Sequence, residues 1–306
     1  MHRLFFLPMS SKPYWVLALA MLGISFAGPL VRLSNAGALA IAVWRLGFSL
    51  VIVAAFLVGS GESRDWRRLS FRELLIAIAA GVSLALHFWA WNASIHLTTI
   101  AASVTLVNLQ PAIVAAISSV ALKEPPTPKQ LVGIGIAILG AMVIAAPALA
   151  IGAAASAPMI GNLLAVSAAF TAAIYYTIGR RLRRVLGVWA YVSIVYGAAL
   201  VTLVLIAVVR GVTLVPQPPR EIAIFAGLAL GPMLLGHTGM NWALKFLPAY
   251  VVNLTVLGEP VGATLLGAVI PSIHQIPSLS TLVGGAIVLG GVIITAPAPR
   301  ANPAGT

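Results

Sequence analysis

Residues 104–121 read VTLVNLQPAIVAAISSVA, an apolar run interrupted by the step Gln110-Pro111. About 150 positions later, residues 251–270 read VVNLTVLGEPVGATLLGAVI and carry Glu259-Pro260 at the matching place. Outward from these two steps, further marks recur in the same order at offsets of 149 to 151 positions: His87 with His237, Asn92 with Asn241, Leu131-Val132-Gly133 with Leu282-Val283-Gly284, and Ala146-Pro147 with Ala296-Pro297. The repetition predicts two related structural units, residues 1–150 and 151–306. Such duplication is typical of membrane transporters.

The composition predicts an integral membrane protein. The chain is 60% hydrophobic and 8% charged, with a mean hydropathy of +1.05, and a soluble domain of this composition would expose a large apolar surface. An apolar helix of roughly 20 residues crosses the hydrocarbon core of a bilayer. We expect ten such spans, in an all-α fold with little room for a soluble catalytic or nucleotide-binding domain: 14–33, 37–58, 72–94, 99–121, 130–146, 160–179, 188–209, 222–243, 249–270 and 279–296.

Five spans in each unit fix the relation between the two units. An odd number of crossings leaves the chain on the opposite side of the membrane, so the second unit is predicted to be inverted relative to the first. The net charge of +12 is then explained by basic loops, and no nucleic-acid partner is expected. With both termini cytoplasmic, the outer segments hold only Arg32, Arg210 and Arg220, while most other basic residues lie inside. The expected location is the inner membrane.

Charged side chains inside the predicted spans mark a candidate site. Glu259 is the one acidic residue near the middle of a span, where a carboxylate faces a cavity, pairs with a cation or is protonated. Two roles are open for it: a contact with a substrate amine or a coupled proton, or a neutral carboxyl bonded to a neighbouring helix. Arg45 lies deep in the second span, where it either binds a substrate carboxylate or caps helix carbonyls.

Two prolines predict breaks in the helices at equivalent positions. Pro111 and Pro260 lack an amide donor, so each frees a carbonyl one turn earlier. The freed carbonyls either bind a polar substrate or only permit a kink. Matching breaks in both units indicate a binding site near the middle of the membrane, which we place near Gln110 and Glu259.

Imidazole, amide and aromatic side chains lie at matching levels of the third and eighth spans. His87 and Trp91 share one helix face, as do His237 and Asn241. The histidines either titrate in the site or form hydrogen bonds between helices. The full set predicted to contact the substrate is Arg45, His87, Trp91, Asn92, Gln110, Tyr175, His237, Asn241, Trp242 and Glu259. There is no cysteine, and no His/Glu pair has ligand spacing on one helix, so neither a metal site nor another cofactor is expected.

The order of these motifs resembles the EamA-type permeases of the drug/metabolite transporter superfamily. The resemblance rests on Trp44-Arg45-Leu46, Gln110-Pro111, Leu122-Lys123-Glu124-Pro125, Gln130-Leu131-Val132-Gly133 and Glu259-Pro260, and it covers about residues 14–297. It implies ten helices, inverted repeats and the movement of small metabolites, often as export of amino acids. The aromatic side chains of the third span make the chain similar to the aromatic amino acid exporters within that family. Gln110 departs from the family pattern, in which an acidic residue often precedes the first proline.

The sequence therefore predicts a secondary transporter or facilitator, not an enzyme. Amino acids are the expected substrates, aromatic ones included, with a bias to export by alternating access. A monomer in the lipid bilayer is favoured. The alternatives are an exporter of drugs or nucleotide-sugar-like metabolites, a polytopic membrane enzyme acting on lipids, and an assembly or packing subunit without a substrate.

Overall fold

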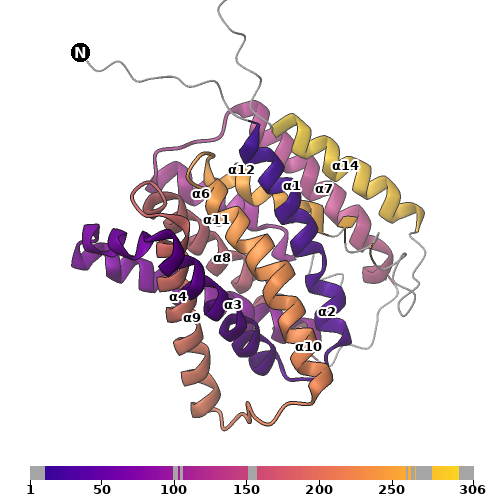
Figure 1. Ribbon diagram of the computed structural model, residues 1–306. Coiled ribbons are helices and arrows are strands. Elements are labelled where there is room, and N and C mark those ends of the chain that lie inside the picture. Colours follow the sequence, from indigo (N-terminus) through magenta and orange to yellow (C-terminus); the bar gives the residue numbers. More distant parts are fainter. Residues whose placement is uncertain are drawn as a thin grey trace, which may run out of the picture.

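The computed structural model describes residues 11–98, 103, 106–150, 157–259, 261–262, 266 and 278–295, and these residues fold into a bundle of helices (Figure 1). The α-helices are α1 (Lys12–Ser25), α2 (Ala27–Leu33), α3 (Ala38–Ser60), α4 (Phe71–Leu97), α6 (Gln110–Ala121), α7 (Pro128–Ala150), α8 (Pro158–Leu182), α9 (Val188–Val209), α10 (Pro219–Leu228), α11 (Gly239–Ala243), α12 (Ala249–Asn253) and α14 (Leu279–Thr295). Two short 3₁₀ segments, η1 (Glu62–Arg68) and η3 (Leu254–Gly258), and one π-helix, η2 (Ala229–Thr238), join or interrupt them.

The chain is a multi-pass membrane protein. Six helical segments of the described residues are long and apolar enough to cross a bilayer: Lys12–Val31, Ala38–Ser60, Phe71–Ile95, Met159–Leu182, Val188–Val209 and Pro219–Ala243. Each overlaps a predicted span. Shorter apolar helices, Gln110–Ala121, Pro128–Val143, Ala249–Gly258 and Leu282–Thr295, fall within the other predicted runs. The all-helical prediction is confirmed, and six spans satisfy the length criterion.

The helices form a central group and a flanking pair. In the central group α4 packs against α8 and α9, α3 packs against α9, and α1 packs along the π-helix η2. The flanking pair consists of α7 and α14, which lie side by side along much of their length at one edge of the bundle (Figure 1). The pairing brings together segments from the two predicted units that lie 151 positions apart at their Leu-Val-Gly marks.

Glycines allow α7 and α14 to approach closely. A Cβ added at Gly140 would lie 2.6 Å from the backbone nitrogen of Val288 and 2.7 Å from the carbonyl oxygen of Gly284. A Cβ at Gly291 would likewise lie 2.5 Å from the backbone nitrogen of Ala137. All three distances are shorter than real contacts of a side chain with backbone, so the two helices touch through their main chains. Small residues are the usual means of such packing in membranes.

Loops 61–70, 122–127, 183–187 and 244–248 meet at one end of the bundle, which we call the basic end. The Glu62 carboxylate accepts hydrogen bonds from the backbone amides of Trp189 (2.7 Å) and Ala190 (3.2 Å), and Asp65 accepts one from Gly187 (2.9 Å). Carboxylates at the first turn of a helix satisfy its free amides and interact favourably with its dipole. These two residues therefore fix the start of α9 to η1.

An ion-pair cluster joins the other loops of the basic end. Arg180 pairs with Glu124 (2.9 Å) and donates to the carbonyl oxygens of Leu244 (2.7 Å) and Lys245 (3.2 Å). Arg184 also pairs with Glu124, at 2.5 Å. The single carboxylate thus connects the loop before α7 to the end of α8, and Arg180 extends the connection to the loop before α12.

The glycine contact predicts opposite effects for two similar substitutions in α7. Gly140→Ala forces a methyl group into the backbone of α14, and overpacking of this kind costs about 1–3 kcal/mol. Gly135 has nothing within 4 Å of an added Cβ, so Gly135→Ala gains helix propensity without a clash. We expect a lower melting temperature for Gly140→Ala and an equal or higher one for Gly135→Ala, measured by thermal unfolding in detergent. Equal melting temperatures for the two variants would contradict the close α7–α14 contact.

Candidate functional site

A small cavity with both polar and apolar lining residues lies among the central helices. Its volume is about 40 Å³, and its lining residues are Ile24, Ala27, Arg45, His87, Phe88, Trp91, Val107, Gln110, Tyr176, Pro232, His237, Val256 and Glu259. The volume accommodates a few water molecules. Pockets around drug-sized ligands measure ~300–1,000 Å³. The cavity is therefore much smaller than a pocket that holds a drug-sized ligand.

Arg45 places a cation in this cavity without an anion bound to it. The residue is 1% exposed, and its guanidinium carbon lies 4.2 Å from the ring centre of Phe88. One terminal nitrogen lies 3.8 Å from the sulfur of Met233, while the buried Nε has no hydrogen-bond partner. A cation over an aromatic face is attracted by the ring. Because among the described residues no carboxylate lies within ion-pair distance of Arg45, the site has donor capacity for an anionic group.

The two histidines of the repeated marks meet inside the bundle. His87 on α4 and His237 on η2 have ring centres 6.4 Å apart in an edge-on arrangement. Nδ1 of His87 lies 3.0 Å from the carbonyl oxygen of Ala168, so this nitrogen carries the proton and Nε2 is an acceptor in the neutral ring. Nδ1 of His237 lies 3.1 Å from the Tyr176 hydroxyl. Each imidazole therefore has a fixed partner on α8 and a face toward the cavity.

The break at Pro111 lies where the fourth predicted span bends. Asn108 and Leu109 form a turn, and α6 begins at Gln110 with Pro111 in its first turn, a position where proline loses no helical hydrogen bond. The Gln110 amide donates to Oδ1 of Asn253 on α12. Asn108, 2% exposed, has an Nδ2 without a partner. The turn thus places an occupied amide and an unoccupied one beside the cavity.

Glu259 lines the same cavity as Gln110 and directly follows the 3₁₀ segment η3. Among the described residues it forms no hydrogen bond or ion pair. Its proline neighbour, Pro260, lies outside the described residues, so the second helix break stays a prediction. With Arg45, Glu259 gives the cavity one basic and one acidic side chain.

Four residues of the predicted set lie outside the cavity in this conformation. Asn92 donates to the carbonyl oxygen of Ala38 (3.2 Å), and Asn241 donates to the Tyr175 hydroxyl and to the carbonyl oxygen of His237 (2.8 Å). Trp242 packs on Phe246, with ring centres 4.6 Å apart. The bonds from Asn92 to Ala38 and from Asn241 to Tyr175 join helices to one another, and the predicted role of these four residues in substrate contact is untested.

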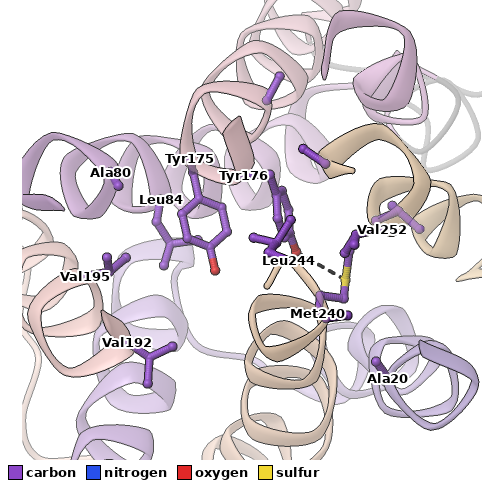
Figure 2. Close-up of a cluster of buried hydrophobic side chains, with 14 of the residues drawn as sticks. Ala20, Ala80, Leu84, Tyr175, Tyr176, Val192, Val195, Met240, Leu244 and Val252 are labelled. Atoms are coloured by element: carbon purple, nitrogen blue, oxygen red, sulfur yellow. Dashed lines mark hydrogen bonds between the residues drawn. The ribbon is translucent and has the colours of Figure 1, made fainter. Parts of the chain in front are cut away.

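Tyr175 and Tyr176 illustrate how neighbouring residues on one helix diverge. Tyr175 points toward Leu84 and the α9 side of the core, while Tyr176 points toward Met240, whose sulfur its hydroxyl contacts at 3.3 Å (Figure 2). Successive helical residues are about 100° apart around the axis, so only one of the two reaches the cavity. Tyr176 is the one that does.

Sequence reasoning did not identify Phe88, Pro232 or Val256 as lining residues. Phe88 is adjacent to His87, yet its ring lies under Arg45 and forms part of the floor of the cavity. Pro232 interrupts the eighth predicted span, and the Gly231-Pro232 step was a usable signal for irregular backbone there. Val256 carries no polar group that would single it out.

Arg183 is a second buried arginine, placed at the basic end just after α8. It is 2% exposed and donates to the carbonyl oxygens of Asn241 (Nε, 2.9 Å) and Leu186. Burial lowers the pKa of Arg183 to about 10, while Glu62 and Asp65 oppose the shift. The side chain therefore stays protonated at neutral pH and acts as a charged donor to two carbonyls.

A helical, multi-pass fold with a buried polar cavity between its helices is the arrangement of a membrane transporter. Residues 11–146 and 159–296 match the EamA-like transporter family. The chain therefore belongs to the EamA-like transporter family, within the drug/metabolite transporter superfamily. Because this is a transporter family, the expectation of transport over enzymatic activity is confirmed.

The fold also resembles a solved one. A crystal structure described only as that of a protein superposes with a TM-score of 0.74 over 93% of this chain and 97% of its own length, at 17% sequence identity. At that identity the likeness concerns the fold. Among curated proteins, none matches the chain at a significant level.

The two buried arginines predict different responses to the same substitution. Arg183→Met leaves two buried carbonyls without a charged donor, and such bonds contribute about 1.5–3 kcal/mol each. Arg45→Met removes a buried cation that has no anionic partner, so we expect unchanged or increased stability. Thermal unfolding of the two variants measures the difference. A large loss of stability in Arg45→Met would show that Arg45 is a structural residue.

Proposed function

We propose that this chain is a secondary transporter of small zwitterionic metabolites, with amino acids as its substrates and a bias to export. The observation that carries the proposal is the pair of opposite charges in one cavity, Arg45 and Glu259. A zwitterion presents a carboxylate and an ammonium group a short distance apart, which matches one cation and one carboxylate. A purely cationic dye leaves Arg45 without a partner, and a sugar uses neither charge.

The roles follow from the chemistry of the lining. The Arg45 guanidinium binds the substrate carboxylate, for which its free Nε and terminal nitrogens are donors. The Glu259 carboxylate binds the ammonium group. Trp91 and Phe88 supply apolar surface for the substrate side chain, which favours aromatic amino acids within the class. The imidazoles of His87 and His237 accept hydrogen bonds from the substrate or donate them to it, between the Arg45 and Glu259 contacts.

Alternating access between two inverted repeats is the proposed mechanism. In this arrangement residues 1–150 and 151–306 form five-span units, both termini are cytoplasmic, and a monomer works in the inner membrane. Three observations support it: the family matches each half separately, His87 lies beside His237, and α7 lies along α14. The small cavity fits a closed intermediate, and the ion pairs of Glu124 at the basic end are contacts that opening to that side would break.

A substrate panel in proteoliposomes tests the function. Purified protein is reconstituted, and uptake of labelled amino acids is compared with uptake of labelled sugars, nucleotide sugars and cationic dyes. We expect saturable movement of amino acids and competition among them. Movement of dyes or nucleotide sugars without amino acids would establish the alternative exporter function. Absence of transport and of any substrate-induced thermal shift across the panel would instead indicate an assembly subunit.

Glu259→Gln tests whether the Glu259 carboxylate binds the substrate. The substitution keeps the shape and removes the charge, so we expect at least tenfold slower amino acid transport, since a lost charged hydrogen bond is worth about 1.5–3 kcal/mol. Glu73→Gln is the matched control, because Glu73 caps α4 through Ser70 and glutamine can also form this capping box. Transport with an unchanged rate and pH dependence in Glu259→Gln would rule out both substrate binding and proton coupling by Glu259.

A further inference from the structure

A second hollow lies at the basic end, on the outer surface of the bundle. It has a volume of about 290 Å³ and forms where η1 leads into α4 beside α9, with a lining of Trp66, Leu69, Ser70, Phe71, Leu74 and Ile194. The lining is almost entirely apolar. Trp66 is held in place by a hydrogen bond from its Nε1 to the carbonyl oxygen of Ala190 (3.1 Å), with 41% of its surface exposed. The groove therefore has a rigid aromatic wall.

The apolar surface continues from this groove along α4. Phe71, Leu75 and Ile78 are spaced at one and two turns and share a helix face. They are 76%, 49% and 38% exposed, and they lie within the span Phe71–Ile95. In a bilayer this face contacts acyl chains. The groove is thus the end of a lipid-facing strip where it reaches the membrane surface.

Exposed arginines lie next in the sequence to residues that line the groove. Arg64, Arg67, Arg68 and Arg72 lie within nine positions of one another, and all four are exposed. Arg68 pairs with Asp65 at 3.0 Å while 66% of its side chain stays exposed. For Arg64, Arg67 and Arg72, no carboxylate lies within ion-pair distance in the part of the chain that the structure describes. These three arginines are therefore exposed cations without an ion-pair partner among the described residues.

The nearby acids compensate the arginine charge only in part. Glu62 accepts from the amides of α9, and Asp65 accepts from Gly187 besides pairing with Arg68. The carboxylate of Glu73 is bonded to the backbone amide (2.9 Å) and hydroxyl (2.8 Å) of Ser70. Residues 62–73 contain four arginines and three carboxylates, so the segment keeps a surplus of positive charge that an external anion can meet.

We propose that this groove binds an anionic phospholipid of the membrane leaflet at the basic end. The phosphate of the headgroup lies among Arg64, Arg67 and Arg72, and one acyl chain occupies the groove beside Trp66 and Leu74 and follows the exposed face of α4. Charge complementarity selects an anionic lipid over a zwitterionic one, because exposed arginines at a membrane surface attract anionic headgroups. The proposal concerns a surface remote from the cavity and does not depend on the transported substrate.

Quenching of Trp66 fluorescence by brominated lipids tests the proposal. The protein is reconstituted in phosphatidylcholine with increasing fractions of phosphatidylglycerol brominated near the headgroup end of its chains, and the reverse series uses brominated phosphatidylcholine in phosphatidylglycerol. The Trp66 signal is the difference between the native protein and Trp66→Phe, because the chain has 7 tryptophans. We expect half-maximal quenching at a fraction of phosphatidylglycerol roughly tenfold lower than of phosphatidylcholine.

Two triple variants test whether the preference for phosphatidylglycerol depends on the arginines next to the groove. Arg64→Gln/Arg67→Gln/Arg72→Gln removes three positive charges from the groove and should abolish the preference for phosphatidylglycerol. Lys123→Gln/Lys129→Gln/Lys245→Gln removes three exposed charges from the same end of the bundle, on two loops and the first turn of α7, none of which lines the groove, and should retain the preference. Equal quenching by both lipids in the native protein, or equal loss of preference in both triple variants, would overturn the proposal.

Ionic strength provides a measurement that needs no variant. Salt screens exposed charges over about 10 Å at 0.1 M. The preference of the native protein for brominated phosphatidylglycerol should therefore decrease as salt is added. A preference that is unchanged at high salt would show that the headgroup is not held by the exposed arginines.

Discussion

The need to satisfy every backbone hydrogen bond inside a medium without water controls this structure. In hydrocarbon each unpaired amide or carbonyl costs several kcal/mol, so regular helices form the surfaces that face lipid. Three departures from regular helix in the described chain are the turn at Asn108 and Leu109, the π-helix η2 and the 3₁₀ segment η3. All three border the cavity, through Val107 and Gln110, through Pro232 and His237, and through Val256 and Glu259. Irregular backbone and polar side chains therefore occur together at this cavity.

Side chains add hydrogen bonds to the backbone of the π-helix η2. Asn241 donates to the carbonyl oxygen of His237 at 2.8 Å, and the Thr238 hydroxyl donates to that of Met233 at 3.2 Å and contacts the Tyr196 hydroxyl at 2.9 Å. These bonds hold His237 in position beside the cavity. They also explain why Asn241, predicted as a substrate contact, is engaged with the protein. A polar residue within a span has two possible roles, and here the neighbouring backbone geometry determines which one it has.

The sequence predicted the six spans that meet the length criterion and six of the residues that line the cavity, because hydropathy and spacing report on burial in a bilayer. Arg45, Gln110 and Glu259 were identifiable since charge or amide groups within apolar runs require a protein partner or a cavity. Which of Tyr175 and Tyr176 lines the cavity was not predictable. The two adjacent residues point to different sides of the helix, and no periodic pattern in the sequence indicates which side faces the cavity. The pairing of Gln110 with Asn253 likewise depends on how α6 and α12 meet. The position of Phe88 under Arg45 is a tertiary contact without a sequence signal.

The scarcity of carboxylates gives Glu259 its significance. The chain has six acidic residues, and five of them have structural partners: Glu62 and Asp65 at the start of α9, Glu73 with Ser70, Glu124 with two arginines, and Glu221 with Ser34 and the amide of Asn35. Those five lie at helix ends and loops, where they compensate amides or cations. Glu259 alone lines a cavity, and its counterpart in the first unit, Gln110, is neutral and bonded to Asn253. Two halves that match in their prolines and histidines therefore differ in charge at the cavity. That difference makes the site asymmetric, so a substrate with two unlike ends has one preferred orientation between Glu259 and Arg45.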